Sequence, residues 1–209
     1  MLVSGDGHRD IAASVRVVLL THPHIREVQL VGSRAAGTPV PLSDWDFTVD
    51  ADDFGVAAAD LPELASSLEP LAQQWDRLSP HYCYMLMLRG PAKVDLLFLD
   101  QPHQPEPPWV ASPDTIVGMD LHFWDWILWL AAKEQARKDS LVRGELEKLG
   151  QHLLGPMGVE ESPRSLDMAV GSYRAARDRL ETEFSVSVPR RLEREVLAVL
   201  PKAEPDALS

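Results

Sequence analysis

Cysteine is nearly absent from this chain, and its scarcity excludes two kinds of site. Cys83 is the single cysteine, so the chain has no internal disulfide framework and no cysteine-rich zinc site. Such low cysteine use fits the reducing cytosol, and we expect a cytoplasmic protein. The first residues, MLVSGDGHRD, also lack the basic and apolar segments of a signal peptide.

Positive charge is scarce as well. The chain has 20 Lys and Arg residues against 32 Asp and Glu residues, which gives a formal net charge of −12. Nucleic-acid backbones are bound by clustered cations, so this balance argues against a nucleic-acid partner. An acidic protein can instead attract a cationic small molecule, or bind an anion together with metal ions.

Long apolar runs are missing too. The most apolar stretch, LHFWDWILWLAA at 121–132, is too short to span a bilayer and contains Asp125. We expect a buried helix there and no membrane partner. The overall composition, with 45% hydrophobic and 25% charged residues, is that of an ordinary globular protein of 209 residues.

The first half of the chain predicts a mixture of helices and strands. In DWDFTVD, apolar and polar residues alternate, which is the period of a strand with two different faces. Arg89-Gly90-Pro91-Ala92 separates two apolar runs, which favours a hairpin. The predicted helices are 9–20 and 53–75, the latter capped by Asp52 or Asp53, and the other predicted strands are 26–31, 81–88 and 93–99.

The second half predicts helices only. A proline-rich segment, 101–114, has the composition of a stiff, extended linker, and the chain becomes helical after it. We therefore expect an α+β protein, with a small mixed-sheet core at 1–105 and an all-helical domain at 106–209. Small-molecule sites often lie between two such halves. The predicted helices of the second domain are 119–154, 163–184 and 189–200.

Three features of the first half carry candidate chemistry. Gly32-Ser33 stands where a strand passes into a helical turn, Asp44 and Asp46 lie on the next strand, and Asp95 lies on a later one. Residues i and i+2 of a strand share a face, so Asp44 and Asp46 present adjacent carboxylates. A divalent cation removes their repulsion, and Mg²⁺ favours such oxygen ligands shared with substrate phosphates. Asp95 can complete a two-ion site or accept a proton from an attacking hydroxyl.

The turn after the first strand suits phosphate oxygens. Gly32 allows close approach of the backbone to a ligand, Ser33 offers N–H groups and a hydroxyl, and Arg34 adds positive charge. Taken alone, Gly32-Ser33 is an ordinary turn, and the two aspartates alone are also compatible with a solvated strand face. The combination favours a site that binds a nucleoside triphosphate with Mg²⁺.

The segment GSRAAGTPVPLSDWDFTV resembles the signature of the polymerase-beta-like nucleotidyltransferases: Gly-Ser, a variable turn, then Asp-x-Asp. Asp95 in KVDLLFL is similar to the third carboxylate of that family. A short α/β core followed by helices resembles, within this superfamily, the aminoglycoside nucleotidyltransferases. The motif covers about residues 25–99, while the helical half agrees only in size and general character.

The resemblance implies a reaction. An acceptor hydroxyl attacks the α-phosphate of a nucleoside triphosphate, a nucleoside monophosphate is transferred, and pyrophosphate leaves. Asp44 and Asp46 then hold Mg²⁺, and Asp95 binds the second ion, acts as the base, or does both. Ser33 and Arg34 hold the β- and γ-phosphates. The expected donor is ATP, and the expected acceptor is a hydroxylated, aminoglycoside-like small molecule, which implies a role in antibiotic resistance.

The helical half contributes thinner signals. Lys133 shares a helix face with Asp125 and Trp129. The resemblance implies that Lys133 contacts the triphosphate. The alternative, which has equal weight, is that Lys133 is a surface lysine paired with a neighbouring residue. Glu134 is a second candidate for the base, although an i,i+4 pair with Lys138 explains it more simply.

Two other functions remain open from the sequence. Some members of this superfamily are antitoxins that bind, and often nucleotidylate, a partner protein, but the shortest of these lack the added helical half. A nucleotide-binding relative without turnover is the other alternative, although the Gly-Ser pair and all three carboxylates are present. The sequence leaves open the identity of the acceptor, the preferred nucleotide base of the donor and whether the protein is a homodimer.

Overall fold

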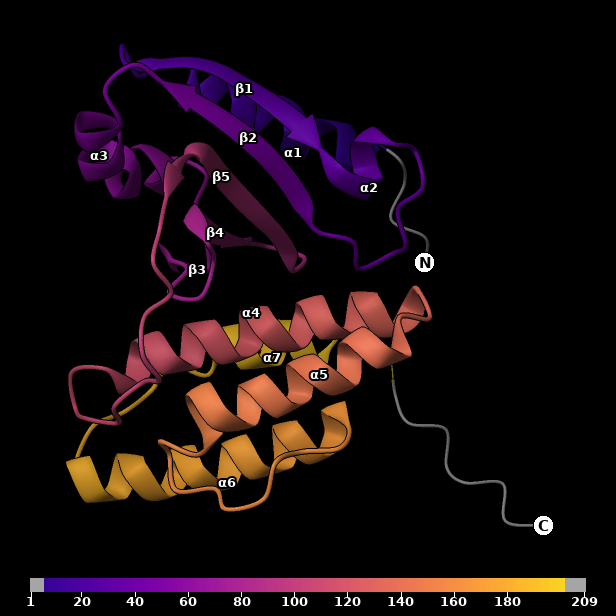
Figure 1. Ribbon diagram of the computed structural model, residues 1–209, viewed down its shortest axis with the longest axis vertical. Coiled ribbons are helices and arrows are strands. Elements are labelled where there is room, and N and C mark those ends of the chain that lie inside the picture. The colour runs from indigo at the N-terminus through magenta and orange to yellow at the C-terminus, as the bar shows by residue number, and fades with distance from the viewer. Residues whose placement is uncertain (1–5, 202–209) are drawn as a thin grey trace. The chain divides into compact units, whose positions relative to one another are not determined.

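The computed structural model describes residues 6–201. For residues 6–10 it describes the course of the main chain but not the side chains. It is an α+β protein, as the sequence predicts: a mixed sheet with helices, followed by helices alone (Figure 1). The chain divides into two compact units. Unit 1 comprises the residues up to Glu106 except Val40–Leu42, and unit 2 comprises Val40–Leu42 and the residues from Pro107 onward.

Unit 1 is built on a five-stranded sheet with the order β1-β2-β5-β4-β3. Strands β2 and β5 pair in parallel, and every other neighbouring pair is antiparallel. The strands are β1 (Ile25–Val31), β2 (Trp45–Ala51), β3 (Ala72–Trp75), β4 (His81–Leu88) and β5 (Ala92–Pro102), and the helices are α1 (Asp6–Leu19), α2 (Gly32–Ala35) and α3 (Phe54–Ser66).

The core of unit 1 lies on one face of this sheet. Alternate residues of β2 and β5, such as Phe47 and Leu96, point to that face and are fully buried. Val15 of α1 and Leu61 of α3 pack into the same core, so these helices cover the face (Figure 1). The intervening residues of β2 and β5 consequently point to the opposite face, where the acidic side chains lie.

The helix predicted at 53–75 is confirmed in its first part, and the prediction is wrong in its second part. The helix starts where expected, with the Asp53 carboxylate accepting a hydrogen bond of 3.1 Å from the Val56 amide. It ends at Ser66 instead of continuing to 75, because Glu69 adopts a positive φ of 50° and Pro70 follows. Residues 72–75 form β3 and pair with β4, so sheet pairing outweighs the local pattern there.

Unit 2 consists of helices that pack around α4. Helix α4 contacts α5, α6 and α7, and its buried side chains include Phe123, Trp124 and Ile127. The predicted helix 119–154 is in fact broken at residues 136–138, where Arg137 has a φ of 57°. The elements are α4 (Ile116–Gln135), α5 (Asp139–Leu149), the π-helical turn η1 (Gly150–Leu154), α6 (Leu166–Phe184) and α7 (Arg191–Leu197).

Within residues 6–201, no helix is both long enough and apolar enough to cross a bilayer. The apolar stretch of α4 is explained by burial instead, with Trp124 fully buried and Trp126 only 7% exposed.

Candidate metal and nucleotide site

Three aspartates converge on the face of the sheet opposite the core of unit 1. Asp44, Asp46 and Asp95 each offer a carboxylate oxygen, and these three atoms lie within 4.8 Å of one another. Within residues 11–201, where side chains are described, this is the one cluster of three or more His, Cys, Asp or Glu side chains arranged to hold a metal ion. The sequence reasoning named the same three residues.

Strand register explains why Asp46 and Asp95 meet. Asp46 of β2 stands directly opposite Asp95 in the parallel β2–β5 ladder, so their side chains leave the same face as neighbours. Asp44 lies two residues before Asp46, at the entry to β2, and is only 6% exposed. Long-range pairing of two strands thus joins a local Asp-x-Asp pair to a residue about fifty positions away.

Gly32 brings the backbone of the turn up to this cluster. On the other side of Asp46, the β1–β2 ladder pairs it with Val31, the residue before Gly32. Gly32 has a φ of +70°, and a Cβ atom built on it would collide with Asp46 Oδ2. The positive φ therefore favours glycine at this position, and any larger residue would force the Asp46 carboxylate to move.

Arg34 fastens the segment that leads into β2. Its Nε donates to the carbonyl oxygens of Ser43 and Asp44, both at 3.0 Å, and its Nη2 donates to Ser43 O at 2.6 Å. The guanidinium carbon lies 4.0 Å from the centroid of the Trp45 ring. Burial lowers the pKa of Arg34, an effect that the nearby carboxylates of Asp44 and Asp46 oppose. Arg34 therefore positions the Asp44 main chain, a role that its sequence assignment to phosphates did not include.

Lys93 is the residue of this site that sequence reasoning missed. It lies two positions before Asp95 on β5, on the same face, and its ammonium group forms an ion pair with Asp95 Oδ1. The Lys93 side chain is 5% exposed and that of Asp95 is 14% exposed. The signal was present in the sequence, because the predicted strand KVDLLFL places lysine and aspartate on one face.

The carboxylates of the cluster repel one another, and a cation bound between them would reduce that repulsion. At an effective dielectric constant of about 20, two carboxylates at such a separation repel each other by roughly 3 kcal/mol. Burial is the main cause of the raised pKa of Asp95; the Asp44 carboxylate raises the pKa further, and Lys93 opposes the shift. Three closely spaced carboxylate oxygens suit a hard divalent ion such as Mg²⁺, which also keeps several water ligands. The donor set thus fits a metal ion, as the sequence predicts.

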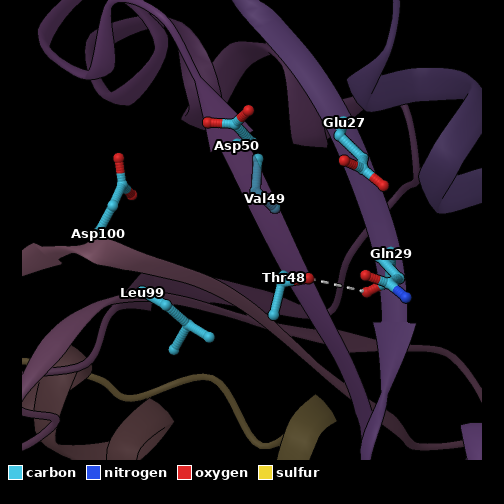
Figure 2. Close-up of a pocket in the computed structure, with 7 residues that line it drawn as sticks. All are labelled: Glu27, Gln29, Thr48, Val49, Asp50, Leu99 and Asp100. Atoms are coloured by element: carbon cyan, nitrogen blue, oxygen red, sulfur yellow. Dashed lines mark hydrogen bonds between the residues drawn. The ribbon is translucent and has the colours of Figure 1, made fainter.

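An acidic hollow lies elsewhere on unit 1. It has a volume of about 180 Å³, and its three lining carboxylates, Glu27, Asp50 and Asp100, come from three different strands (Figure 2). Thr48 also lines it, and its hydroxyl donates a hydrogen bond of 3.5 Å to the carbonyl oxygen of Gln29 (Figure 2). These acids do not form a metal-binding group of the kind seen at Asp46. Asp50 is therefore a suitable control for Asp46, since both belong to β2.

The remaining predicted residues stay predictions. Ser33 lies in the short helix α2, next to Gly32, and its backbone carbonyl accepts from the Thr38 amide at 2.9 Å. Lys133 belongs to unit 2, on α4, where its ammonium nitrogen lies 4.9 Å from the centroid of the Trp129 ring. Glu134, the alternative base, is on the same helix.

Comparison with known proteins finds similarity in structure. No protein-family model matches the chain, and no curated protein matches it in sequence. The chain is similar to the crystal structure of an aminoglycoside 6-adenyltransferase from Bacillus subtilis, at 13% identity over 94% of this chain and 97% of that chain. The TM-score of this similarity is 0.33, a value too low to establish a shared fold.

Proposed function

We propose that this protein is a magnesium-dependent nucleotidyltransferase that moves AMP from ATP onto a hydroxyl group of a small molecule. The observation that carries the proposal is the convergence of the Asp44, Asp46 and Asp95 carboxylates within 4.8 Å, with the Gly32 backbone against Asp46. This is the arrangement that the Gly-Ser and Asp-x-Asp motifs imply for the polymerase-beta-like family. We assign donor chemistry to residues 1–105 and acceptor choice to residues 106–209.

Residues of the protein would hold the metal ion and the triphosphate in place. Asp44 and Asp46 would hold Mg²⁺, which neutralises phosphate charge and orients the α-phosphate. Gly32 and Ser33 offer backbone space and N–H groups to the phosphates, and Arg34 keeps the Asp44 main chain in place. Lys133 is proposed as a further triphosphate contact.

Asp95 is the proposed base. The O–H bond of the acceptor breaks as its oxygen attacks the α-phosphorus, the proton passes to an Asp95 oxygen, and pyrophosphate leaves with the electrons of the bond to the α-phosphorus. The raised pKa of Asp95, caused mainly by burial, makes that carboxylate a better proton acceptor than an exposed aspartate. Glu134 is the alternative base.

The acceptor is proposed from charge alone. A net charge of −12 favours a cationic compound over an anionic one. Polyhydroxylated amines, the chemical class of aminoglycosides, combine such charge with the hydroxyl group that the reaction needs.

A pyrophosphate-release screen tests the proposal. The four nucleoside triphosphates are each combined with Mg²⁺ and a panel of hydroxylated amines, neutral sugars and anionic metabolites. We expect release with ATP and a cationic acceptor, and mass spectrometry should find one adenylyl group on that acceptor. Asp46→Asn should abolish release, whereas Asp50→Asn should retain it. Calorimetry showing that ATP with Mg²⁺ does not bind, or activity that survives in Asp46→Asn, would refute the proposal.

A further inference from the structure

A buried lysine lies next to the acidic cluster. Lys93 is 5% exposed, and its ammonium group pairs with Asp95 Oδ1. A lysine is rarely buried to this extent without a partner, because removing its charge from water is costly. Its position is set by β5, where alternate residues share a face, so Lys93 cannot leave the side of the sheet that bears Asp95 without breaking the strand.

The register also brings Lys93 beside the start of β2. Val94 pairs with Trp45 in the β2–β5 ladder, and Asp44 and Lys93 are the residues that immediately precede Trp45 and Val94 in the sequence. Lys93 therefore belongs to the same local group as the acids. Three carboxylates carry a formal charge of −3, and the Lys93 ammonium reduces it to −2, which a single divalent ion balances.

The ammonium group and a metal ion compete for the same carboxylate, that of Asp95. Lys93 contacts Asp95 Oδ1, while Asp44 and Asp46 offer further oxygens of the cluster. A second divalent ion at Asp95 would have to displace the ammonium or share a carboxylate with it, and the two positive charges would repel each other. Additional negative charge, such as that of a triphosphate, would offset this repulsion.

We propose that in the nucleotide-free protein the Lys93 ammonium group occupies the place beside Asp95 where a second divalent ion would bind. The acidic cluster then binds one divalent ion until a triphosphate is present. The inference rests on the proposed function, because it takes Asp44 and Asp46 as the ligands of that one ion. It makes Lys93 a positioning residue that sets the number of bound ions.

Counting bound Mn²⁺ tests this inference without measuring turnover. Free Mn²⁺ is followed by electron paramagnetic resonance, and heats of binding by calorimetry, with the nucleotide-free full-length protein. We expect one Mn²⁺ in the wild type and two in Lys93→Met, whose side chain has a similar length but no charge. Lys93→Arg, the matched control that keeps the charge, should bind one. With α,β-methylene-ATP, the wild type should take up a second Mn²⁺.

The outcomes separate this inference from the proposed function. A Lys93→Met variant that binds one Mn²⁺ with the wild-type affinity, or a nucleotide-free wild type that binds two, overturns the role of Lys93 alone. A wild type that binds no Mn²⁺ at all overturns both proposals. Circular dichroism verifies the fold of each variant, and Lys93→Gln replaces Lys93→Met in the same count if the methionine variant does not fold.

Discussion

Gly32 lies directly against the carboxylate of Asp46, with no room for a single additional carbon atom between them. This contact ties the Gly-Ser turn to the Asp-x-Asp strand, although the two are separated by a loop. The β1–β2 ladder produces it, because Val31 pairs with Asp46 and Gly32 comes next in the chain. The contact makes the glycine part of the site and not merely part of a turn.

Gly32→Ala should therefore disturb the acidic cluster specifically. Gly32 and Gly37 have nearly the same φ, +70° and +71°, but a Cβ atom on Gly37 would meet nothing within 4 Å. Both alanine variants should lose about 1 kcal/mol of stability from the backbone strain. Only Gly32→Ala should also weaken Mn²⁺ binding, by about tenfold or more, because Asp46 must move. Calorimetry and urea unfolding measure the two effects, and equal Mn²⁺ affinities in both variants would contradict the assignment.

Divalent ions should stabilise the fold through Asp46. A ligand that binds only the folded state adds about 2.7 kcal/mol at a concentration one hundred times its Kd. We expect Mg²⁺ to raise the melting temperature of the wild type and of Asp50→Asn, but not that of Asp46→Asn. Without metal, Asp46→Asn should be at least as stable as the wild type, since it removes one of the mutually repelling charges. A metal-induced shift that survives in Asp46→Asn would exclude this aspartate as a ligand.

Arg34→Lys distinguishes a positioning role from a simple charge. Lysine keeps the positive charge but lacks the planar group through which Arg34 reaches the carbonyls of Ser43 and Asp44. If Arg34 positions Asp44, the variant should lose about 1–2 kcal/mol of stability and exchange its Asp44 and Trp45 amide hydrogens faster. Unchanged hydrogen exchange, combined with a raised KM for ATP, would instead point to a phosphate contact alone.

Asp95→Asn and Glu134→Gln separate the two candidates for the base. Asp95→Asn should reduce kcat by about a hundredfold or more, the usual size of a lost general base. Glu134→Gln should leave kcat and its pH profile nearly unchanged. A pyrophosphate assay across pH makes the comparison, and the opposite ranking of the two variants would move the base to the helical unit.

Asp120 should make the stability of unit 2 depend on pH. Burial raises the pKa of Asp120 to about 6, although Trp124 Nε1 donates to it at 3.0 Å and the Tyr173 hydroxyl donates to the same oxygen. Between the ordinary aspartate pKa and this value, the folded state keeps a proton that the unfolded state has lost. The free energy of unfolding should thus fall by roughly 3 kcal/mol as the pH rises from about 4 to about 6.

Asp120→Asn should remove that dependence. The amide oxygen can accept both hydrogen bonds and never ionises, so the variant should gain stability relative to the wild type as the pH rises through this interval. Urea unfolding at several pH values gives the difference curve. The exposed Asp114→Asn is the control and should parallel the wild type. A flat difference between Asp120→Asn and the wild type would show that Asp120 ionises normally in the fold.

The local pattern of residues was sufficient to predict several features of this protein. Alternation in DWDFTVD determined that Asp44 and Asp46 share a face, because side chains of a strand alternate whatever the strand pairs with. Turn residues likewise predicted the β4–β5 hairpin, and Asp53 predicted the start of α3. Each of these follows from backbone geometry over a few residues.

Other features depended on contacts between distant segments. Residues 72–75 form a strand and not the end of a helix, because β4 offers them a pairing edge. The Lys93–Asp95 ion pair depends on which groups surround β5 once the sheet has formed. Asp120 resembles any other helical aspartate until Tyr173, 53 positions away, packs over it.

The sequence alone determined which residues have the chemistry to hold a metal ion: two aspartates on one strand face and a third on another strand. Only the tertiary structure decided that β5 lies beside β2, parallel to it and in the register that sets Asp95 opposite Asp46. The reason is that alternation along a strand is a local property of the backbone. Strand order and register depend instead on how the whole sheet packs against α1 and α3.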